Sequence, residues 1–209
     1  MNTNPRAKTV ICYGDSNTWG ANPFKDERLP ANVRWTGVLQ DILGKEYEVI
    51  SEGLFGRTFI AEDPNKPYKC GITHLKSILA TNKPIDIIIV MLGTNDLKNT
   101  YGLSVADIAN HLKQTIEFIK KELEGDDSQI LVICPPPVVN PSSKELDKRL
   151  VDAPKNSLLL PPLYEKVAKD LGCLYLDAGK FINLENTDGY HMASEHHKIL
   201  GEKVASVIK

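Results

Sequence analysis

The sequence predicts an α/β protein, a three-layer α/β/α sandwich built around a five-stranded parallel sheet. Five short apolar runs recur along the 209 residues, and amphipathic helical patterns stand between them. Strand–helix alternation requires right-handed crossovers and places helices on both faces of one parallel sheet. The run "IDIIIVML" is nearly continuous and β-branched, as is typical of a central strand covered on both faces. The length suits a single domain, residues 1–209, with a substantial core.

The apolar runs set the expected strands in chain order. Each run is short and is bounded by polar or glycine-rich segments, as strands of a buried sheet are. The expected strands are Thr9–Tyr13, Glu48–Ser51, Ile85–Met91, Ile130–Cys134 and Leu174–Asp177.

Four amphipathic segments between and after these runs predict helices. The first, "VRWTGVLQDILG", closes at Gly44, a residue type that favours the position just after a helix. The second, "SVADIANHLKQTIEFIKKEL", opens at Ser104, a good N-cap. The segments "LYEKVAKDLG" and "EHHKILGEKVASVI" complete the alternation. The expected buried faces are Val33, Trp35, Val38, Leu39 and Ile42 in the first helix and Ile108, Leu112, Thr115, Ile119 and Leu123 in the second.

Composition and charge narrow the functional class. A net charge of -2 gives no basic surface for nucleic acid and no polybasic segment for anionic membranes. No apolar run approaches the roughly 18 residues of a membrane span, and the first residues lack the apolar region of a signal peptide. Cys12, Cys134 and Cys173 lie in or beside apolar runs, without a C-x-x-C spacing, and are interpreted as structural thiols. We therefore expect a cytoplasmic protein.

Polar, glycine-rich segments follow the predicted strands. In sheets of this kind, ligands bind outside the carboxyl ends of the strands. The segments in question are "GDSN" at 14–17, "SEGLFGRT" at 51–58, "GTND" at 93–96, "PPPVVNP" at 135–141 and "DGYH" at 188–191. Their clustering at one sheet edge predicts a functional site there.

Three of these residues have the chemistry of acyl transfer. Ser16 supplies a hydroxyl nucleophile, His191 a base, and Asp188, three residues earlier, a carboxylate that holds the imidazole in the productive tautomer. The alternative role for Ser16 is a helix N-cap. Three donors are available for an oxyanion: the backbone N–H groups of Ser16 and Gly56 and the side-chain amide of Asn95.

The blocks "GDSNTWG", "EGLFGRT", "GTND" and "DGYHMASEHH" resemble, in this order, those of the SGNH hydrolases, the GDSL-type esterase and lipase superfamily. They are most similar to the bacterial arylesterase and acyltransferase branch. The resemblance implies a flavodoxin-like sheet, no metal and no organic cofactor. It also implies Ser16, Asp188 and His191 as catalytic residues, with Ser16, Gly56 and Asn95 in the oxyanion hole. One departure is Asn17, where the superfamily's first block has leucine.

For other residues near the predicted site, a structural role and a functional role are both considered. Trp19, Phe55 and Tyr190 either bind substrate or belong to the core. Asp15 is expected to hold its loop by hydrogen bonds. Arg57 either stabilises an anionic substrate or ties down its loop by hydrogen bonds to carbonyl oxygens, and the second role is favoured. A metal site is not expected, since the segment is not H-E-x-x-H and His196 and His197 point to different helix faces, toward solvent or the sheet edge. His74 and His111 are interpreted as surface positions without partners.

The sequence thus predicts a serine esterase that hydrolyses short-chain, acetyl-type esters through an acyl-enzyme on Ser16, with acyltransfer to alcohols as a second outcome. The acyl preference rests on the resemblance alone. The alternatives are a carbohydrate deacetylase or a lysophospholipase or thioesterase with the same residues, or a ligand-binding protein without turnover. The expected partner is a small-molecule ester. The loops Ala21–Asn32 and Pro135–Pro154 leave a homo-oligomer open.

Overall fold

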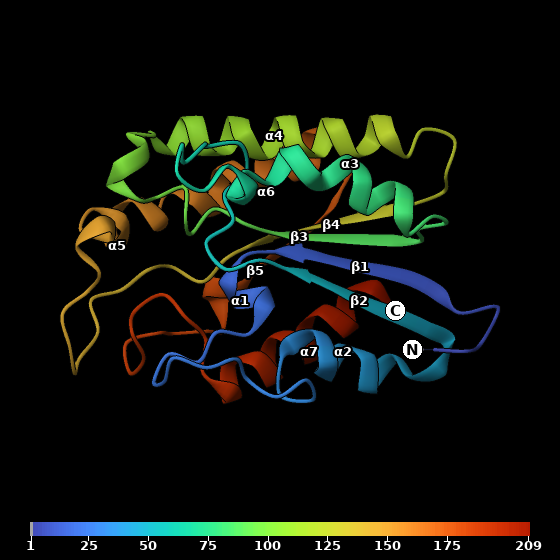
Figure 1. The fold of residues 1–209 in the computed structure, drawn as a ribbon, viewed down its shortest axis with the longest axis horizontal. Helices are drawn as coiled ribbons and strands as arrows, with labels where there is room; N and C mark the ends of the chain where they lie inside the picture. Colours follow the sequence, from blue (N-terminus) through green and yellow to red (C-terminus); the bar gives the residue numbers. More distant parts are fainter. Residues whose placement is uncertain (1) are drawn as a thin grey trace.

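A computed structural model describes residues 2–209 and contains one sheet of five parallel strands in the order β2-β1-β3-β4-β5 (Figure 1). The order reverses at β1, which pairs with β2 on one side and β3 on the other. This is the flavodoxin-like order, so the predicted fold class is confirmed. The strands are β1 Lys8–Gly14, β2 Tyr47–Gly53, β3 Ile87–Met91, β4 Gln129–Cys134 and β5 Leu174–Asp177.

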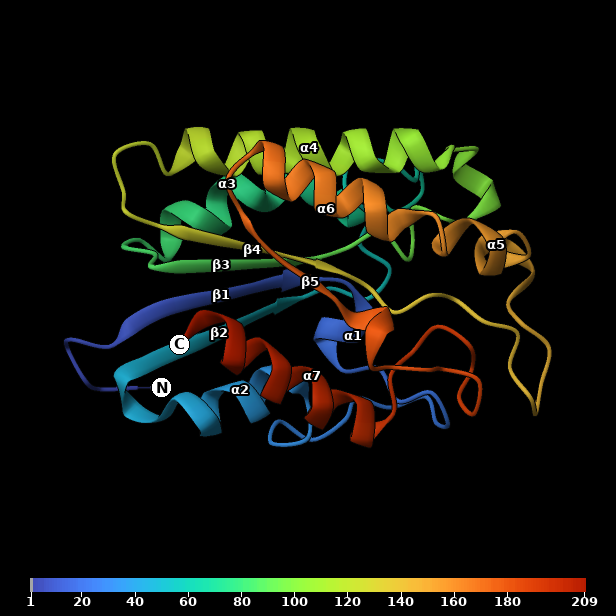
Figure 2. The same ribbon diagram turned by 180° about the vertical axis from the view of Figure 1, so that it is seen from behind.

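Helices cover both faces of the sheet. Helices α3, α4 and α6 lie over one face and α2 and α7 over the other, as Figures 1 and 2 show from opposite sides. Between residues 2 and 209, no helix has the length and apolar composition needed to cross a lipid bilayer. The helices are α1 Ser16–Trp19, α2 Trp35–Leu43, α3 Gly71–Thr81, α4 Val105–Glu122, α5 Ala153–Ser157, α6 Leu160–Asp170 and α7 Ser194–Ile208.

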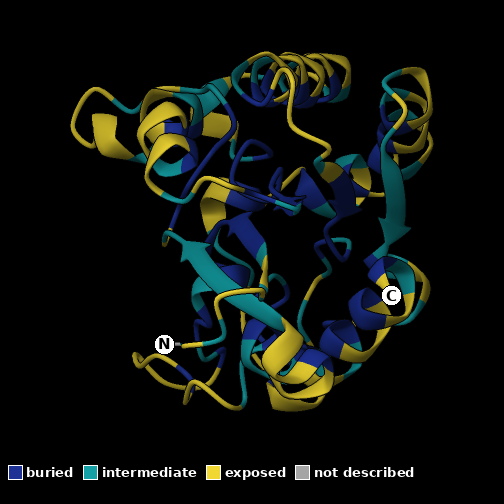
Figure 3. Ribbon diagram, turned by 90° about the vertical axis from the view of Figure 1, so that its right-hand side faces the viewer, coloured by how far each residue is buried: buried dark blue, intermediate teal, exposed yellow. Residues whose placement is uncertain are grey.

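The sheet separates two apolar layers. Along β1, Ile11 and Tyr13 pack into the layer beneath α3, α4 and α6, while Val10 and Cys12 pack into the layer against α2 and α7. Every residue of β3 is buried, which explains its continuous apolar run. In Figure 3 the buried residues, in dark blue, lie on the inward sides of the helices, and the exposed ones face outward. Helices therefore cover both apolar layers, and a functional site is expected at the ends of the strands instead.

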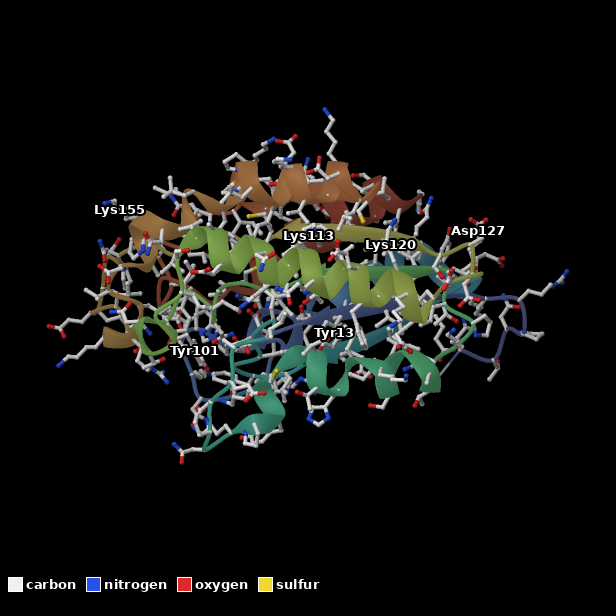
Figure 4. All side chains as sticks on the ribbon, turned by 90° about the horizontal axis from the view of Figure 1, so that it is seen from above. Tyr13, Tyr101, Lys113, Lys120, Asp127 and Lys155 are labelled. Carbon is white, nitrogen blue, oxygen red and sulfur yellow. The ribbon has the colours of Figure 1, made fainter. Side chains whose placement is uncertain are left out.

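The long helix α4 forms as its sequence predicts. The Ser104 side chain accepts the backbone N–H of Asp107, and the Asp107 carboxylate accepts that of Ser104, which makes a reciprocal capping box. The predicted apolar stripe is buried. Figure 4 labels Lys113 and Lys120 on this helix, and both residues are exposed.

The end of α2 agrees with the prediction, whereas one of the side chains predicted to be buried does not. Gly44 ends the helix with a φ of +65°, as the sequence indicates. Ile42, expected in the core, is instead 37% exposed. The buried apolar side chains of this helix are Trp35, Leu39 and Leu43, which are spaced by four residues, and Ile42 lies about 60° to one side of Leu39, on the exposed flank of this stripe.

Two histidine assignments were wrong. His111, expected at the surface without a partner, is half-buried, with its Nδ1 4.0 Å from a carboxylate oxygen of Asp96. His197, expected at the solvent or the sheet edge, is fully buried, and its Nδ1 accepts the backbone N–H of Trp35 at 3.2 Å. Burial lowers the pKa of His197 to about 3. His197 is therefore a neutral side chain that joins α7 to the start of α2.

The four cysteines are free thiols. Cys12, Cys70 and Cys134 are buried, and burial raises the pKa of Cys12 and Cys134 well above the ordinary value for a thiol. A buried, protonated thiol is a poor nucleophile and metal ligand. This agrees with the structural role expected for them.

Candidate active site

Ser16 lies at the carboxyl end of the interior strand β1, as the first residue of the four-residue helix α1. The N-cap of this helix is Asp15, whose carboxylate accepts the backbone N–H of Asn17 at 2.9 Å. Gly14 permits the sharp turn, because a Cβ there would stand 2.8 Å from the Met91 carbonyl oxygen. Asp15 rather than Ser16 therefore caps this helix, and the Ser16 hydroxyl does not serve as the N-cap.

Ser16, His191 and Asp188 form a continuous hydrogen-bonded chain. The Ser16 Oγ lies 2.9 Å from the His191 Nε2, although the two residues are 175 positions apart. The His191 Nδ1 lies 2.7 Å from the Asp188 Oδ2. An ionised Asp188 makes Nδ1 the protonated nitrogen, which leaves Nε2 free to accept the serine proton. Only 5% of Ser16, 8% of Asp188 and 5% of His191 is exposed to solvent.

The turn that carries both Asp188 and His191 keeps the carboxylate ionised. Its Oδ1 accepts the backbone N–H groups of Tyr190 at 3.2 Å and of His191 at 2.8 Å. Burial alone would raise the pKa of Asp188, but the hydrogen bonds and charge of His191 and the N–H of Tyr190 outweigh it and lower that pKa. The D-x-x-H spacing therefore places the acid and the base in one self-supported turn.

Two backbone N–H groups at this sheet edge have no protein acceptor. Among residues 2–209, neither the Ser16 N–H nor the Gly56 N–H donates a hydrogen bond. Gly56 adopts a φ of +82°, a conformation that glycine adopts without strain. Arg57, the next residue, donates to the carbonyl oxygens of Gly14 and Glu52 and so ties this loop to the strand ends, as expected.

The amide of Asn95 comes from the loop after β3. Its Nδ2 donates to the Arg57 carbonyl oxygen at 3.1 Å and makes a long 3.4 Å contact with Asp15 Oδ2. Its Oδ1 accepts the Lys98 ammonium at 2.5 Å, which fixes the amide orientation with the nitrogen turned toward Asp15. Lys98 was not among the residues predicted from the sequence. The signal was its position three residues after Asn95 in one turn, closed by the Lys98 N–H on the Asn95 carbonyl at 3.2 Å.

Asp15 is a buried carboxylic acid next to these groups. Burial raises the pKa of Asp15 to about 6, although the N–H of Asn17 and the charges of His191 and Lys98 act in the opposite direction. Asp15 contacts Asn17 and Asn95 but makes no hydrogen bond with Ser16 or His191. Its place is consistent with the loop-holding role expected from the sequence.

A model of the GDSL-like lipase/acylhydrolase family matches residues 12–199, which include every residue of this constellation. The chain belongs to this family. Among solved structures, a carbohydrate acetylesterase family member from Sinorhizobium meliloti superposes with a TM-score of 0.90 at 30% identity, over 96% of this chain and 97% of that one. The aryl esterase of M. Smegmatis superposes with a TM-score of 0.86 at 33% identity, over 96% and 97% of the two chains.

A curated relative of this GDSL-family chain is the acetylxylan esterase of Xylanibacter ruminicola. The two are 27% identical over 219 residues, which cover 96% of this chain and 43% of that protein. The chain therefore spans less than half the length of this relative.

Asn17 stands where the GDSL block has leucine. It connects the turn that carries Ser16 to the turn that carries His191. It is buried, its Nδ2 donates to the Tyr190 carbonyl oxygen at 2.9 Å, and its Oδ1 accepts the Met192 N–H at 2.9 Å. These two residues flank His191 on either side. Asn17 thus holds the backbone on both sides of the imidazole, a role that leucine has no polar atoms to fill.

A pocket of about 370 Å³ adjoins the histidine and includes two of the three aromatic residues singled out from the sequence. Trp19 and Phe55 line it together with His191, and their rings meet edge to face at 5.8 Å. Phe55 is 48% exposed, which excludes the core alternative for this residue. Tyr190 does not line the pocket; its ring lies against His191, with centroids 4.3 Å apart.

The remaining histidines point in different directions. The His196 Nδ1 accepts the backbone N–H of Ala193 at 3.2 Å, whereas His197 faces Trp35 in the core. Within residues 2–209, no three His, Cys, Asp or Glu side chains are grouped to hold a metal ion.

Proposed function

We propose that this chain is a serine esterase that hydrolyses short-chain, acetyl-type carboxylic esters through an acyl-enzyme on Ser16. The observation that carries the proposal is the buried hydrogen-bonded chain from Ser16 through His191 to Asp188. Membership of the GDSL family supports it, as do relatives named as acetylesterases and aryl esterases.

In the first half of the proposed reaction, the Ser16 Oγ attacks the ester carbonyl carbon while His191 Nε2 accepts its proton. Asp188 stabilises the imidazolium that forms. The oxyanion accepts hydrogen bonds from the unpaired backbone N–H groups of Ser16 and Gly56. It also accepts one from the side-chain amide of Asn95, whose N–H gives up its long contact with Asp15 to bind the substrate. His191 then protonates the leaving alcohol, which departs and leaves an acyl group on Ser16.

In the second half, His191 takes a proton from water, the hydroxide attacks the acyl-enzyme, and the carboxylic acid is released as Ser16 regains its proton. An alcohol in place of water yields a new ester, which is the acyltransferase outcome. The leaving group must lie within reach of His191, so the pocket of Trp19 and Phe55 is the proposed site for the alcohol part.

A second candidate is a carbohydrate deacetylase with the same residues. It is favoured by the printed names of the Sinorhizobium meliloti and Xylanibacter ruminicola relatives. A lysophospholipase or thioesterase has no such support. A binding protein without turnover is disfavoured because the side chains of Ser16, His191 and Asp188 are hydrogen-bonded to one another in a continuous chain. The cytoplasmic location and the homo-oligomer stay predictions.

The test is hydrolysis of p-nitrophenyl acetate, butyrate and octanoate by the wild type and by Ser16→Ala, with acetylated xylan and monosaccharide acetates assayed in parallel. We expect hydrolysis that declines with chain length and disappears in Ser16→Ala. Equal activity in both proteins refutes the assignment of Ser16. Faster release of acetate from sugars than from aryl acetates selects the second candidate.

A further inference from the structure

A second pocket, of about 280 Å³, adjoins the proposed oxyanion hole and is lined mainly by charged residues. Gly56 forms part of its wall, so it shares a residue with the proposed reaction centre. The mechanism above makes no use of it. Its charged residues are Lys66, Lys69, Lys98, Arg149, Glu62 and Asp63.

Three of the cations come from three different loops. Lys69 belongs to the segment between β2 and α3, Lys98 follows β3, and Arg149 lies in the long segment after β4. All of these loops leave the carboxyl ends of strands, the edge at which Ser16 lies. Figure 4 places Tyr101, which also lines the pocket, at this end of the molecule, with Asp127 at the opposite end. The fold therefore gathers these charges beside the active site.

Both lysine ammonium groups lie beside residues that carry proposed oxyanion donors. The Lys98 Nζ bonds to the Asn95 Oδ1, as described above. The Lys69 Nζ lies 2.6 Å from the point where a Cβ on Gly56 would stand. The Lys69 carbonyl oxygen also accepts the Thr58 N–H at 3.1 Å, which fixes the backbone of Lys69 to the Gly56 loop. An anion between these ammonium groups would thus sit next to the scissile bond.

The two lysines have no counter-ion of their own. Among residues 2–209, neither Lys69 nor Lys98 forms an ion pair, whereas Arg149 is paired with Asp147. Burial, with repulsion from Arg149 and Lys69, lowers the pKa of Lys98 to about 8, although Asp15 and Asp147 act in the opposite direction. Half-buried like charges destabilise each other, and a bound anion relieves that repulsion.

We propose that this pocket is an anion-binding subsite and that the esters preferred by this protein carry a carboxylate near the scissile bond. The proposal rests on the proposed esterase function and narrows its substrate class. Glu62 and Asp63 at the same pocket limit its positive excess, which suits a single negative charge better than a dianion. The positive residues contribute both attraction and orientation of the substrate.

The test compares matched esters that differ in one charge. The pair 4-acetoxybenzoate and its methyl ester varies the charge on the alcohol part, and the pair mono-4-nitrophenyl adipate and 4-nitrophenyl hexanoate varies it on the acyl part. We measure kcat/KM for the wild type, for Lys69→Met and for the control Lys45→Met. Lys45 is exposed and lies in the turn before β2, at the opposite edge of the sheet.

We expect the wild type to favour the anionic ester in at least one pair, and the pair that shows this identifies the part of the ester that enters the subsite. Lys69→Met lowers the ratio of anionic to neutral kcat/KM by about three- to fivefold, and Lys45→Met leaves it unchanged. Ser16-dependent hydrolysis of the neutral esters without any charge preference refutes the subsite and leaves the proposed function intact. A charge preference that Lys69→Met leaves undiminished refutes it as well.

Calorimetry on Ser16→Ala decides the subsite independently of turnover. Tighter binding of 4-acetoxybenzoate or of mono-4-nitrophenyl adipate than of its neutral partner, weakened by adding Lys69→Met, supports the proposal. Equal binding within both pairs contradicts it, even if no ester is hydrolysed and the proposed function has failed.

Discussion

Asn17 shows how one residue can couple two distant turns of the chain. It follows the proposed nucleophile directly, and both of its amide atoms bond to the turn that carries His191. The sequence marked this position as a departure from the family block but gave no partner for it. The partners are backbone atoms some 173 and 175 residues away, which no local pattern encodes.

Replacing Asn17 by leucine should lower kcat by about tenfold or more with a smaller change in KM, because the imidazole loses its two-sided support and small displacements at a reacting centre are costly. The measurement is steady-state hydrolysis of p-nitrophenyl acetate. Asn110→Leu, an exposed position on α4, is the matched control. A kcat within twofold of the wild type would mean that Asn17 does not position the histidine.

Asn95→Ala should lower kcat on the order of 10²–10³-fold, as is typical when one oxyanion donor is removed. The loss should be similar for good and poor leaving groups, since the oxyanion forms with either. Thermal unfolding of the variant serves as the check on folding. Normal turnover in a folded Asn95→Ala protein would exclude the amide from the oxyanion hole and leave its hydrogen bonds with Arg57 and Lys98 as its role.

At the scale of whole elements, the strands were easier to predict than the helices. Buried parallel strands are continuous apolar runs, and all five appear where the sequence places them, with no end shifted by more than two residues. Helix α3 was not delimited, because Cys70 at its N-cap provides no side-chain hydrogen bond and only Leu75 and Leu79 are buried apolar side chains along it. His197 was misassigned because its burial depends on α2, which packs against α7 from more than 150 residues away.

The junction of α2 and α7 should make stability depend on pH. The pKa of His197 is about 3 in the folded protein and about 6.5 when unfolded, so the unfolded chain binds the proton first as pH falls. Stability should therefore be unaffected above pH 6.5 and decline from there toward pH 3. By pH 5 the loss is about 2 kcal/mol.

Urea unfolding of the wild type and of His197→Asn between pH 7.5 and pH 4.5 measures this dependence. An asparagine keeps an acceptor for the Trp35 N–H but does not titrate, so its unfolding free energy should fall less steeply. The contributions of Asp15 and Asp96 are common to both proteins and cancel in the comparison. His74→Asn, at an exposed position of α3, is the control. Parallel curves for the wild type and His197→Asn would show that the histidine is not held neutral.

For the molecule as a whole, topology explains why the site was predictable. The strand order reverses at β1, and Ser16 and Asn95 follow β1 and its neighbour β3, at the switch point where sheets of this kind bind ligands. Ser16, Gly56 and Asn95 therefore lie shortly after strands, whereas Asp188 and His191 lie farther along the segment that follows β5. The pocket that contains Lys69 and Lys98 was not predicted, because its residues lie in irregular loops, whose mutual approach has no periodic signature in the sequence.

The central claim is that Ser16 is the nucleophile, and trapping it covalently tests this most directly. The wild-type protein is treated with a fluorophosphonate, residual esterase activity is followed, and the adduct is located by peptide mass spectrometry. The account predicts one phosphonyl group per chain, on Ser16, formed in step with loss of activity and absent from both Ser16→Ala and Asp188→Asn. Inactivation with the adduct on another residue, or full activity of protein labelled at Ser16, would contradict it.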